Sequence, residues 1–73
     1  MSSLYASDRP SLDGNGKCIG SHGVLIASGS ERIVWRGETR PLNPDDPKDY
    51  SCVGLAVKDA QKELDHRKQK GVL

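Results

Sequence analysis

Residues 24–36 read VLIASGSERIVWR, and this stretch decides the fold. Two β-prone runs, Val24–Ala27 and Arg32–Arg36, flank a short loop that contains a glycine. This arrangement is typical of a β-hairpin. The sequence therefore predicts a hairpin over about residues 23–37, with a small sheet if the region Cys18–Ile19 extends it.

Side chains alternate between the two faces of a strand, and this alternation predicts which hairpin residues are buried. On the second run, we expect Ile33 and Trp35 to share one face and Val34 to take the other. A lone hairpin is marginally stable in water, so its apolar face needs cover. We expect Ile33 and Trp35 to pack against the helix residues Val53, Val57 and Leu64.

A single helix is predicted over about residues 47–69. Asp46 suits the N-cap, Pro47 the first helical position, and Asp49 the first turn, where the helix dipole favours a carboxylate. Gly71 suits the residue that follows the helix. An amphipathic stripe supports the helix and predicts its buried face. The stripe consists of Tyr50, Val53, Val57, Ala60 and Leu64.

The remaining segments complete the predicted organisation. Residues 1–17 carry few apolar side chains, and we expect them to form a flexible arm. Residues 40–46 contain two of the four prolines and predict a stiff linker. Residues 18–73 then form one small α+β domain, in which a β-hairpin or short antiparallel sheet packs against one C-terminal helix.

Composition narrows the classes of function. The chain has 73 residues, 34% hydrophobic residues and no Phe, which leaves too little apolar volume for both a core and an enclosed substrate cavity. No apolar run approaches the ~20 residues of a membrane span. The net charge of +1 argues against non-specific nucleic-acid binding as the main activity. We therefore expect a small, soluble, monomeric binding module without enzymatic activity.

Charge is distributed unevenly along the chain. Residues 43–49 hold three Asp and one Lys, whereas residues 58–70 hold five Lys or Arg and three Asp or Glu. The chain is therefore acidic before the predicted helix and basic towards its end. A protein partner with charges of both signs would complement this pattern.

The sequence gives little support for a metal or cofactor site. Cys18 and His22 have a ligand-like spacing, and Cys52 with His66 could complete a zinc set. However, Cys52 and His66 lie ~21 Å apart on one predicted helix. We therefore expect no metal and no cofactor, and two reduced thiols in a chain without a signal peptide.

The sequence also lacks a catalytic motif. The segment Asp13–Lys17 resembles a phosphate-binding loop, but Ser11 and Cys18 stand where that motif requires Gly and Ser or Thr. An ordinary turn is the better interpretation. No Ser, His and Asp cluster has a recognisable nucleophile context, and we expect no catalytic residue.

Two surfaces are candidates for binding a partner. On the hairpin, Arg32, Val34 and Arg36 accompany Trp35, and Arg with Trp is typical of interface hot spots. A core anchor is the favoured interpretation of Trp35 in a protein without Phe, and the two Arg could still contact a partner. The basic end of the helix, formed by Arg67, Lys68 and Lys70, could bind a partner or only compensate the helix dipole. An unpaired hairpin edge could also accept an extended peptide.

The whole chain resembles a small transcription-regulator family of lytic phages that infect Xanthomonas. The resemblance runs from MSSLYASDRP at residues 1–10 through RIVWRGETRPLNPDDPKDY at 32–50 to KELDHRKQKG at 62–71. It implies a protein of the bacterial host cytoplasm that binds host RNA polymerase. It further implies inhibition of initiation by displacement of the sigma factor, and antitermination during elongation. The implied contacts are the N-terminal segment of the β′ subunit and the flap region of the β subunit.

Two other classes remain open. A nucleic-acid-binding protein could use the hairpin arginines and the basic helix end, and its affinity would fall steeply with salt. A zinc-stabilised module would lose its fold in a chelator.

Overall fold

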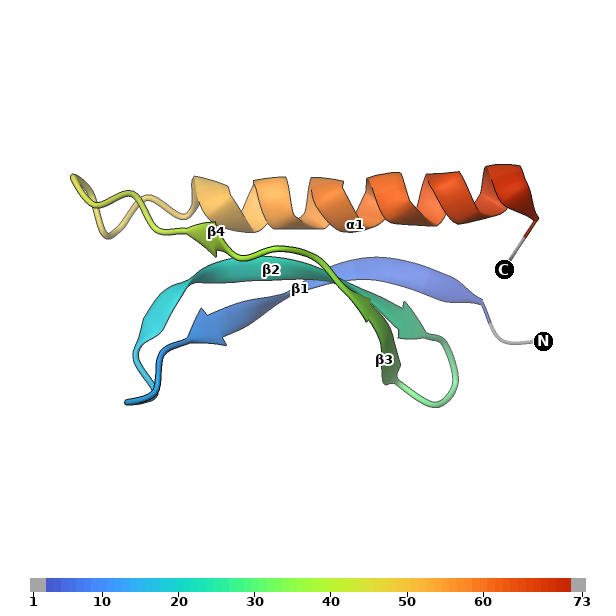
Figure 1. The fold of residues 1–73 in the computed structure, drawn as a ribbon, viewed down its shortest axis with the longest axis horizontal. Coiled ribbons are helices and arrows are strands. Elements are labelled where there is room, and N and C mark those ends of the chain that lie inside the picture. Colours follow the sequence, from blue (N-terminus) through green and yellow to red (C-terminus); the bar gives the residue numbers. More distant parts are fainter. Residues whose placement is uncertain (1–2, 72–73) are drawn as a thin grey trace.

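The computed structural model describes residues 3–71. The helix lies along one face of a curved antiparallel sheet, so the molecule has two layers (Figure 1). The elements are β1 (Leu4–Leu12), β2 (Cys18–Ala27), β3 (Arg32–Arg36), β4 (Arg40–Pro41) and α1 (Ser51–Lys70). The predicted α+β class, a short antiparallel sheet packed against one C-terminal helix, is confirmed.

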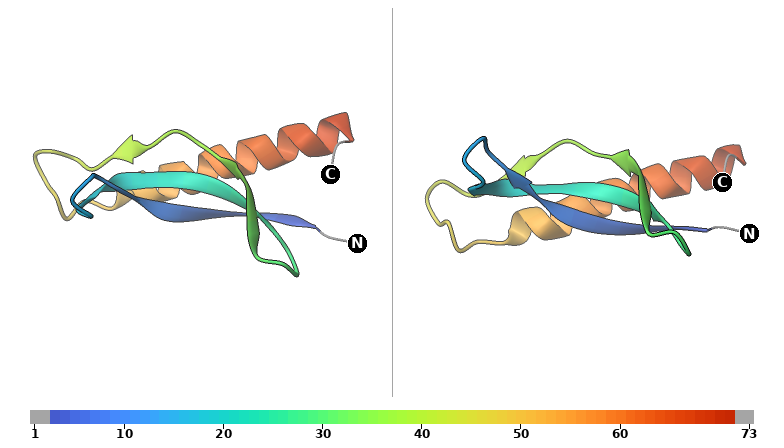
Figure 2. Two further views of the ribbon diagram at one scale, coloured as in Figure 1. Left: turned by 60° about the horizontal axis from the view of Figure 1, so that its bottom comes forward. Right: turned by 90° about the horizontal axis from the view of Figure 1, so that it is seen from below.

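Strand β2 is the centre of the sheet. β1 pairs with one side of β2, and both β3 and β4 pair with the other side. All three pairings are antiparallel. The helix runs obliquely across β1 and β2 (Figure 2). The predicted hairpin, including its extension to Cys18, is therefore confirmed as β2 and β3.

The prediction of a flexible arm over residues 1–17 is wrong for the described residues of that segment. Leu4–Leu12 form β1, which pairs with β2 along its whole length. Leu4 and Ala6 pack against the core cluster under the helix. The strand is polar in composition, but its backbone hydrogen bonds and two buried contacts offset the ordering entropy. Residues 1 and 2 lie outside the described residues.

A tight turn connects β1 to β2. One carboxylate oxygen of Asp13 accepts hydrogen bonds from the backbone N–H groups of Asn15 and Lys17, at 2.8 and 3.0 Å. Gly16 has a φ of 81°, a conformation that glycine adopts without strain. This segment is the ordinary turn that the sequence favoured over a phosphate loop.

Three consecutive residues of β2 form the centre of the core. Val24, Leu25 and Ile26 are at most 1% exposed. Leu25 packs with Ala60 and Leu64 of α1. Because side chains alternate along a strand, Val24 and Ile26 point to the opposite, concave face of the sheet (Figure 1). The core therefore extends through the sheet to both of its faces.

Side chains from the sheet and its loops cross the concave face. Tyr5 lies opposite Ile26, and its hydroxyl donates a hydrogen bond to the carboxylate of Glu31. This hydrogen bond raises the pKa of Tyr5 above its usual value. The buried Ser11 hydroxyl makes hydrogen bonds with Nδ1 of His22 at 2.8 Å and with the Thr39 hydroxyl at 3.1 Å. These contacts connect distant parts of the chain on the face that lacks a helix.

Of the predicted stripe, only Ala60 and Leu64 are confirmed as buried residues of the helix face that packs on the sheet. The buried helix residues are Cys52, Ala56, Ala60 and Leu64. Val53 and Val57 are only half-buried, and Tyr50 is 67% exposed. Small residues face β2 because the two backbones approach closely. A Cβ at Gly23 would lie 2.1 Å from the backbone oxygen of Ala56.

The start of the helix also differs from the prediction. α1 begins at Ser51, and Asp46 closes a turn instead of capping the helix, accepting a hydrogen bond from the Lys48 N–H at 3.1 Å. Aspartate side chains stabilise such turns in competition with helix. Asp49 accepts a hydrogen bond from the Ser51 N–H at 3.0 Å, and this bond lowers the pKa of Asp49. The predicted end is confirmed, since Gly71 follows the helix with a φ of 69°.

The predicted linker over residues 40–46 is partly a strand. Arg40 and Pro41 form β4, opposite Ser21 and Gly20 of β2. Proline is tolerated there because β4 lies at the edge of the sheet. A Cβ at Gly20 would lie 2.1 Å from the Arg40 backbone oxygen, so only glycine allows this approach.

Candidate functional site

The outer edge of β3 is the first part of the candidate site. In the described part of the chain, β3 pairs only with β2, so its other edge is unpaired. Three of the four hairpin candidates, Arg32, Val34 and Arg36, are exposed. Unpaired backbone groups at such an edge can bind an extended peptide.

A β-bulge separates the side chains of this edge. Trp35 lies opposite Leu25 and Ile33 lies opposite Ile26, so Val34 is the additional residue of the bulge. The prediction that Ile33 and Trp35 share one face is therefore wrong. Because directly paired residues share a face, Trp35 lies on the helix side and Ile33 on the concave side. The shift in register arises because two residues of β3 face one residue of β2 there.

The bulge also places the two hairpin arginines on opposite faces. Arg32 is paired with Ala27 and shares the helix side with Trp35. Arg36 is paired with Val24 and belongs to the concave side. The structure therefore does not bring Arg32 and Arg36 into one patch, although both lie on the same strand edge.

A shallow groove lies between the helix and the chain segment that leads from β3 to β4. Its volume is about 330 Å³. The lining residues are Trp35, Gly37, Glu38, Arg40, Asp59, Lys62 and Glu63. Trp35 also packs against the core cluster, so it serves both the core and the surface. Gly37 allows this, because a Cβ there would lie 2.8 Å from the Trp35 indole.

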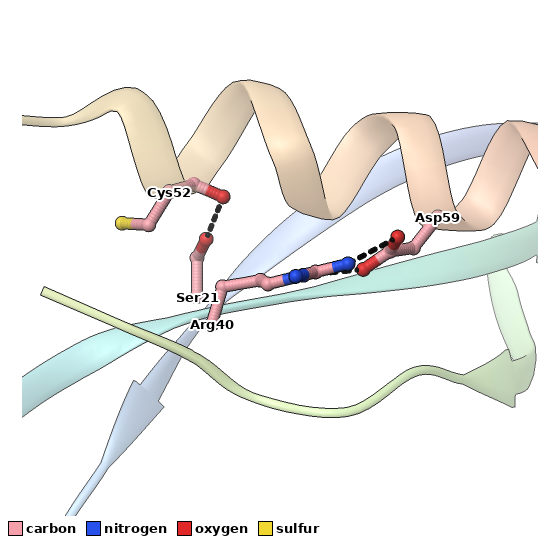
Figure 3. Close-up of polar contacts among 4 residues, drawn as sticks. All are labelled: Ser21, Arg40, Cys52 and Asp59. Carbon is pink, nitrogen blue, oxygen red and sulfur yellow. Dashed lines mark hydrogen bonds and ion pairs between the residues drawn. The ribbon is translucent and has the colours of Figure 1, made fainter.

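One ion pair holds β4 to the helix. Nε and Nη2 of Arg40 each donate to a different carboxylate oxygen of Asp59 at 2.8 Å (Figure 3). This two-pronged hydrogen bonding lowers the pKa of Asp59 and raises that of Arg40. Nearby, the Ser21 hydroxyl donates to the backbone oxygen of Cys52 at 3.1 Å (Figure 3). These contacts fix one wall of the groove against the sheet.

The groove carries charges of both signs. Asp59 is paired with Arg40, and Glu63 is paired with Arg67 at 3.1 Å. Among residues 3–71, neither Glu38 nor Lys62 has an ion-pair partner. The groove therefore offers one uncompensated charge of each sign beside an aromatic side chain.

The basic helix end lies in a different part of the molecule from the concave face that carries Arg36. Lys68 and Lys70 are exposed in the last turn of α1, whereas Arg67 is half-buried and engaged by Glu63. Glu63 and Arg67 are four residues apart, the spacing at which opposite charges on a helix pair. Of this candidate set, only the two lysines present free cations to a partner.

The residues considered for zinc are dispersed. Cys18 is exposed on β2 and its thiol donates to the Gly20 backbone oxygen, whereas Cys52 is buried in the first turn of α1. His22 makes its hydrogen bond on the concave face, and His66 is exposed near the helix end. Within residues 3–71, no group of three or more His, Cys, Asp or Glu is arranged to hold a metal ion.

Sequence reasoning missed the groove. It identified Trp35, but Arg40 and Asp59 are 19 residues apart and no local pattern connects them. Lys62 and Glu38 were likewise part of unremarkable polar stretches. These residues come together only because the segment from β3 to β4 runs beside the helix in the folded protein.

Comparisons with known proteins give no relative. No family model matches the chain, and no curated protein or solved structure is significantly similar to it. In the part of the chain that the structure describes, no helix is both long enough and apolar enough to cross a membrane.

Proposed function

We propose that the protein is a phage-encoded transcription regulator that binds host bacterial RNA polymerase in the host cytoplasm. In this proposal it inhibits initiation by displacing the sigma factor and acts as an antiterminator during elongation. The proposal starts from the resemblance of residues 1–10, 32–50 and 62–71 to such phage regulators. A role as a binding module without catalysis is consistent with its small core.

The observation that carries the proposal is the unpaired edge of β3 beside the Trp35 groove. A short extended segment of a larger protein can add to this edge as a further strand, with backbone hydrogen bonds supplying affinity. Trp35 and Arg32 share the helix side of the edge, and both residue types dominate binding energy at protein interfaces.

The two polymerase contacts are assigned to separate surfaces. The N-terminal segment of the β′ subunit is proposed to lie along Arg32–Arg36 and over the groove. The flap region of the β subunit is proposed to contact the helix end through Lys68 and Lys70, which are exposed. Arg67 contributes less in this assignment because Glu63 already engages it.

A pull-down with the tagged protein tests the proposal directly. Purified RNA polymerase core and holoenzyme are each offered at moderate and at high salt. We expect retention of core at both salt concentrations and loss of sigma from the retained holoenzyme. Absence of core retention at either salt concentration would reject the proposal.

Paired variants test the assigned edge. We expect R32A/R36A to weaken polymerase binding by about tenfold or more, since hot-spot residues cost upwards of ~2 kcal/mol on truncation. The control R9A/K17A removes two equally exposed cations from β1 and its turn and is expected to change binding by less than about twofold. Equal affinities of the two variants for polymerase would show that the β3 edge is not part of the interface.

A direct nucleic-acid-binding function makes a different prediction. Such a protein would shift DNA or RNA in a gel without polymerase and would lose affinity steeply with salt. Retention of polymerase that vanishes after nuclease treatment would favour this function over a protein interface.

A further inference from the structure

Four basic residues recur at every fourth position along α1. They are Lys58, Lys62, His66 and Lys70, and we name them the basic row. All four are exposed. With a rise of 1.5 Å per residue, successive members are separated by about 6 Å along the helix axis. The row therefore forms a regular series of three lysines and one histidine that winds slowly across the helix surface.

The acidic residues beside the row are largely neutralised. Asp59 is held by Arg40 and Glu63 by Arg67. Asp65 accepts a hydrogen bond from the uncharged Gln61 at 3.0 Å and has no ion-pair partner among the described residues. In the described residues, none of the lysines of the row takes part in an ion pair. Among the described residues, three lysines thus face one uncompensated carboxylate of α1, Asp65, and Glu38 lines the same groove as Lys62 without an ion pair.

The chemistry of the row differs from that of the β3 edge. Lysine is depleted at protein–protein interfaces, whereas aromatic residues and arginine are enriched there. The row contains no aromatic residue and no arginine, and one exposed apolar residue, Leu55, lies near its start. Lysine binds phosphate as a point charge and needs no fixed orientation. The spacing of the row is similar to that of successive phosphates along a nucleic-acid strand.

We propose that the basic row of α1 is a contact surface for the phosphodiester backbone of a nucleic acid. The contact is independent of sequence, because the row offers charge and no groups for reading bases. It is a secondary contact in a protein of net charge +1 and does not depend on the polymerase proposal. A strand held along α1 leaves the β3 edge free, since that edge belongs to the sheet, but it shares Lys62 of the groove and Lys70 of the helix end with the proposed polymerase contacts.

The first test is a nuclear magnetic resonance titration of the isolated full chain with a short single-stranded RNA and a short DNA duplex at low salt. We expect amide shifts concentrated at Lys58–Lys70 on the exposed side of α1. Amide shifts with both probes would indicate recognition of the phosphodiester backbone that RNA and DNA share. Shifts with one probe alone would identify RNA or DNA as the ligand. Absence of shifts for both probes, or shifts confined to Arg32–Arg36, would overturn the proposal.

Matched variants then test the row by affinity and salt dependence. With three lysines engaged, the slope of log affinity against log salt for RNA is about −2. K58Q/K62Q is expected to lower the affinity by about tenfold and to reduce the steepness by about 1.4. The control K17Q/K48Q removes the same charge from exposed positions at the other end of the molecule and is expected to change affinity by less than about twofold.

Two further measurements separate the row from general charge effects. D65N removes the uncompensated carboxylate and is expected to raise RNA affinity by about twofold. A polyglutamate peptide is expected to bind more weakly than RNA of equal charge. Equal losses in K58Q/K62Q and K17Q/K48Q, or a preference for polyglutamate, would overturn the assignment to nucleic acid.

Discussion

Gly23 sets the distance between the sheet and the helix. The absence of a side chain lets the backbone of α1 approach β2 at Ala56 and Ala60. This approach selects alanines for the buried face and leaves the larger valines at its flanks. A single residue of the strand therefore determines the rotation of the helix about its axis.

Gly23→Ala and Gly54→Ala are expected to change stability in opposite directions. A Cβ at Gly23 would lie 2.1 Å from the Ala56 oxygen, and the forced separation should cost about 2–3 kcal/mol. A Cβ at Gly54 meets no atom within 4 Å, and alanine in the helix should contribute about 0.5–1 kcal/mol. Equilibrium urea unfolding measures both free energies. Stabilisation by Gly23→Ala would contradict the close approach.

Single residues differ in how far the sequence reveals their roles. Gly71 and the pair of Glu63 with Arg67 were predictable because helix ends and neighbouring turns follow local rules. The burial of Cys52 and Ala56 was not predictable. Their place in the core depends on Gly23, which is far away in the sequence and close only in the folded protein.

Strand β4 is two residues long and depends on side-chain contacts to stay in place. Among the described residues it pairs only with Gly20 and Ser21, and Arg40 connects it to α1 through Asp59. The Arg40 guanidinium holds the pKa of Asp59 below its usual value. The strength of this connection therefore depends on pH.

Acid should weaken the folded protein partly through Asp59. Because its pKa is lower in the folded state, Asp59 stabilises the fold above about pH 4, and this contribution disappears as pH falls through the folded-state pKa. We expect D59N to be less stable than the natural chain at neutral pH and to lose less stability on acidification. Thermal unfolding at a series of pH values measures this.

Asp65→Asn provides the matched control on the same helix. Asp65 is exposed and accepts a hydrogen bond only from Gln61 among the described residues. Because D65N breaks no ion pair of the described residues, it is expected to be about as stable as the natural chain at neutral pH, whereas D59N is expected to be less stable. Parallel stability curves for D59N and the natural chain would show that the ion pair with Arg40 does not stabilise the fold.

The elements of the fold were predictable to different degrees. The hairpin and the helix have strong local patterns, and both were predicted. β1 was missed because six of its nine residues are polar, charged, proline or small, and its order comes from pairing with β2. The helix start was misplaced because aspartates that suit a cap also suit turns. The bulge at Val34 has no sequence signature.

At the scale of the whole molecule, charge separates along the long axis. The acidic segment over residues 43–49 lies at one end, beside the turn from β1 to β2, and the basic end of α1 lies at the other (Figure 1). The longest dimension is 42 Å. The resulting dipole can orient the protein as it approaches a charged partner.

The molecule should unfold in one cooperative step. Trp35 on β3, Leu25 on β2 and Leu64 on α1 pack in one cluster, so loss of either layer exposes the core between them. We expect helical circular dichroism and Trp35 fluorescence to give coincident denaturation midpoints. Separate midpoints would show that the hairpin and the helix are independent units.

The candidate site was predictable only in part. The sequence identified the residues of the β3 edge from their types, because Arg and Trp at an unpaired strand are typical of interfaces. It could not give the groove, since Glu38, Arg40 and Lys62 meet only after the chain has passed from the sheet to the helix. The separation of Arg32 from Arg36 likewise required the register of the bulge.

The order of elements along the chain has a consequence for synthesis on the ribosome. β1, β2 and β3 are synthesised before α1. Leu25 and the backbone at Gly23 are therefore not yet covered by the helix in the nascent chain. The concave side, by contrast, can close as soon as Tyr5 reaches Glu31. In the nascent chain, the concave face of the sheet is thus already covered, whereas the apolar face that packs on α1 remains exposed until the helix has formed. Fast translation through residues 51–64 would shorten the period in which neighbouring nascent chains can associate through that face.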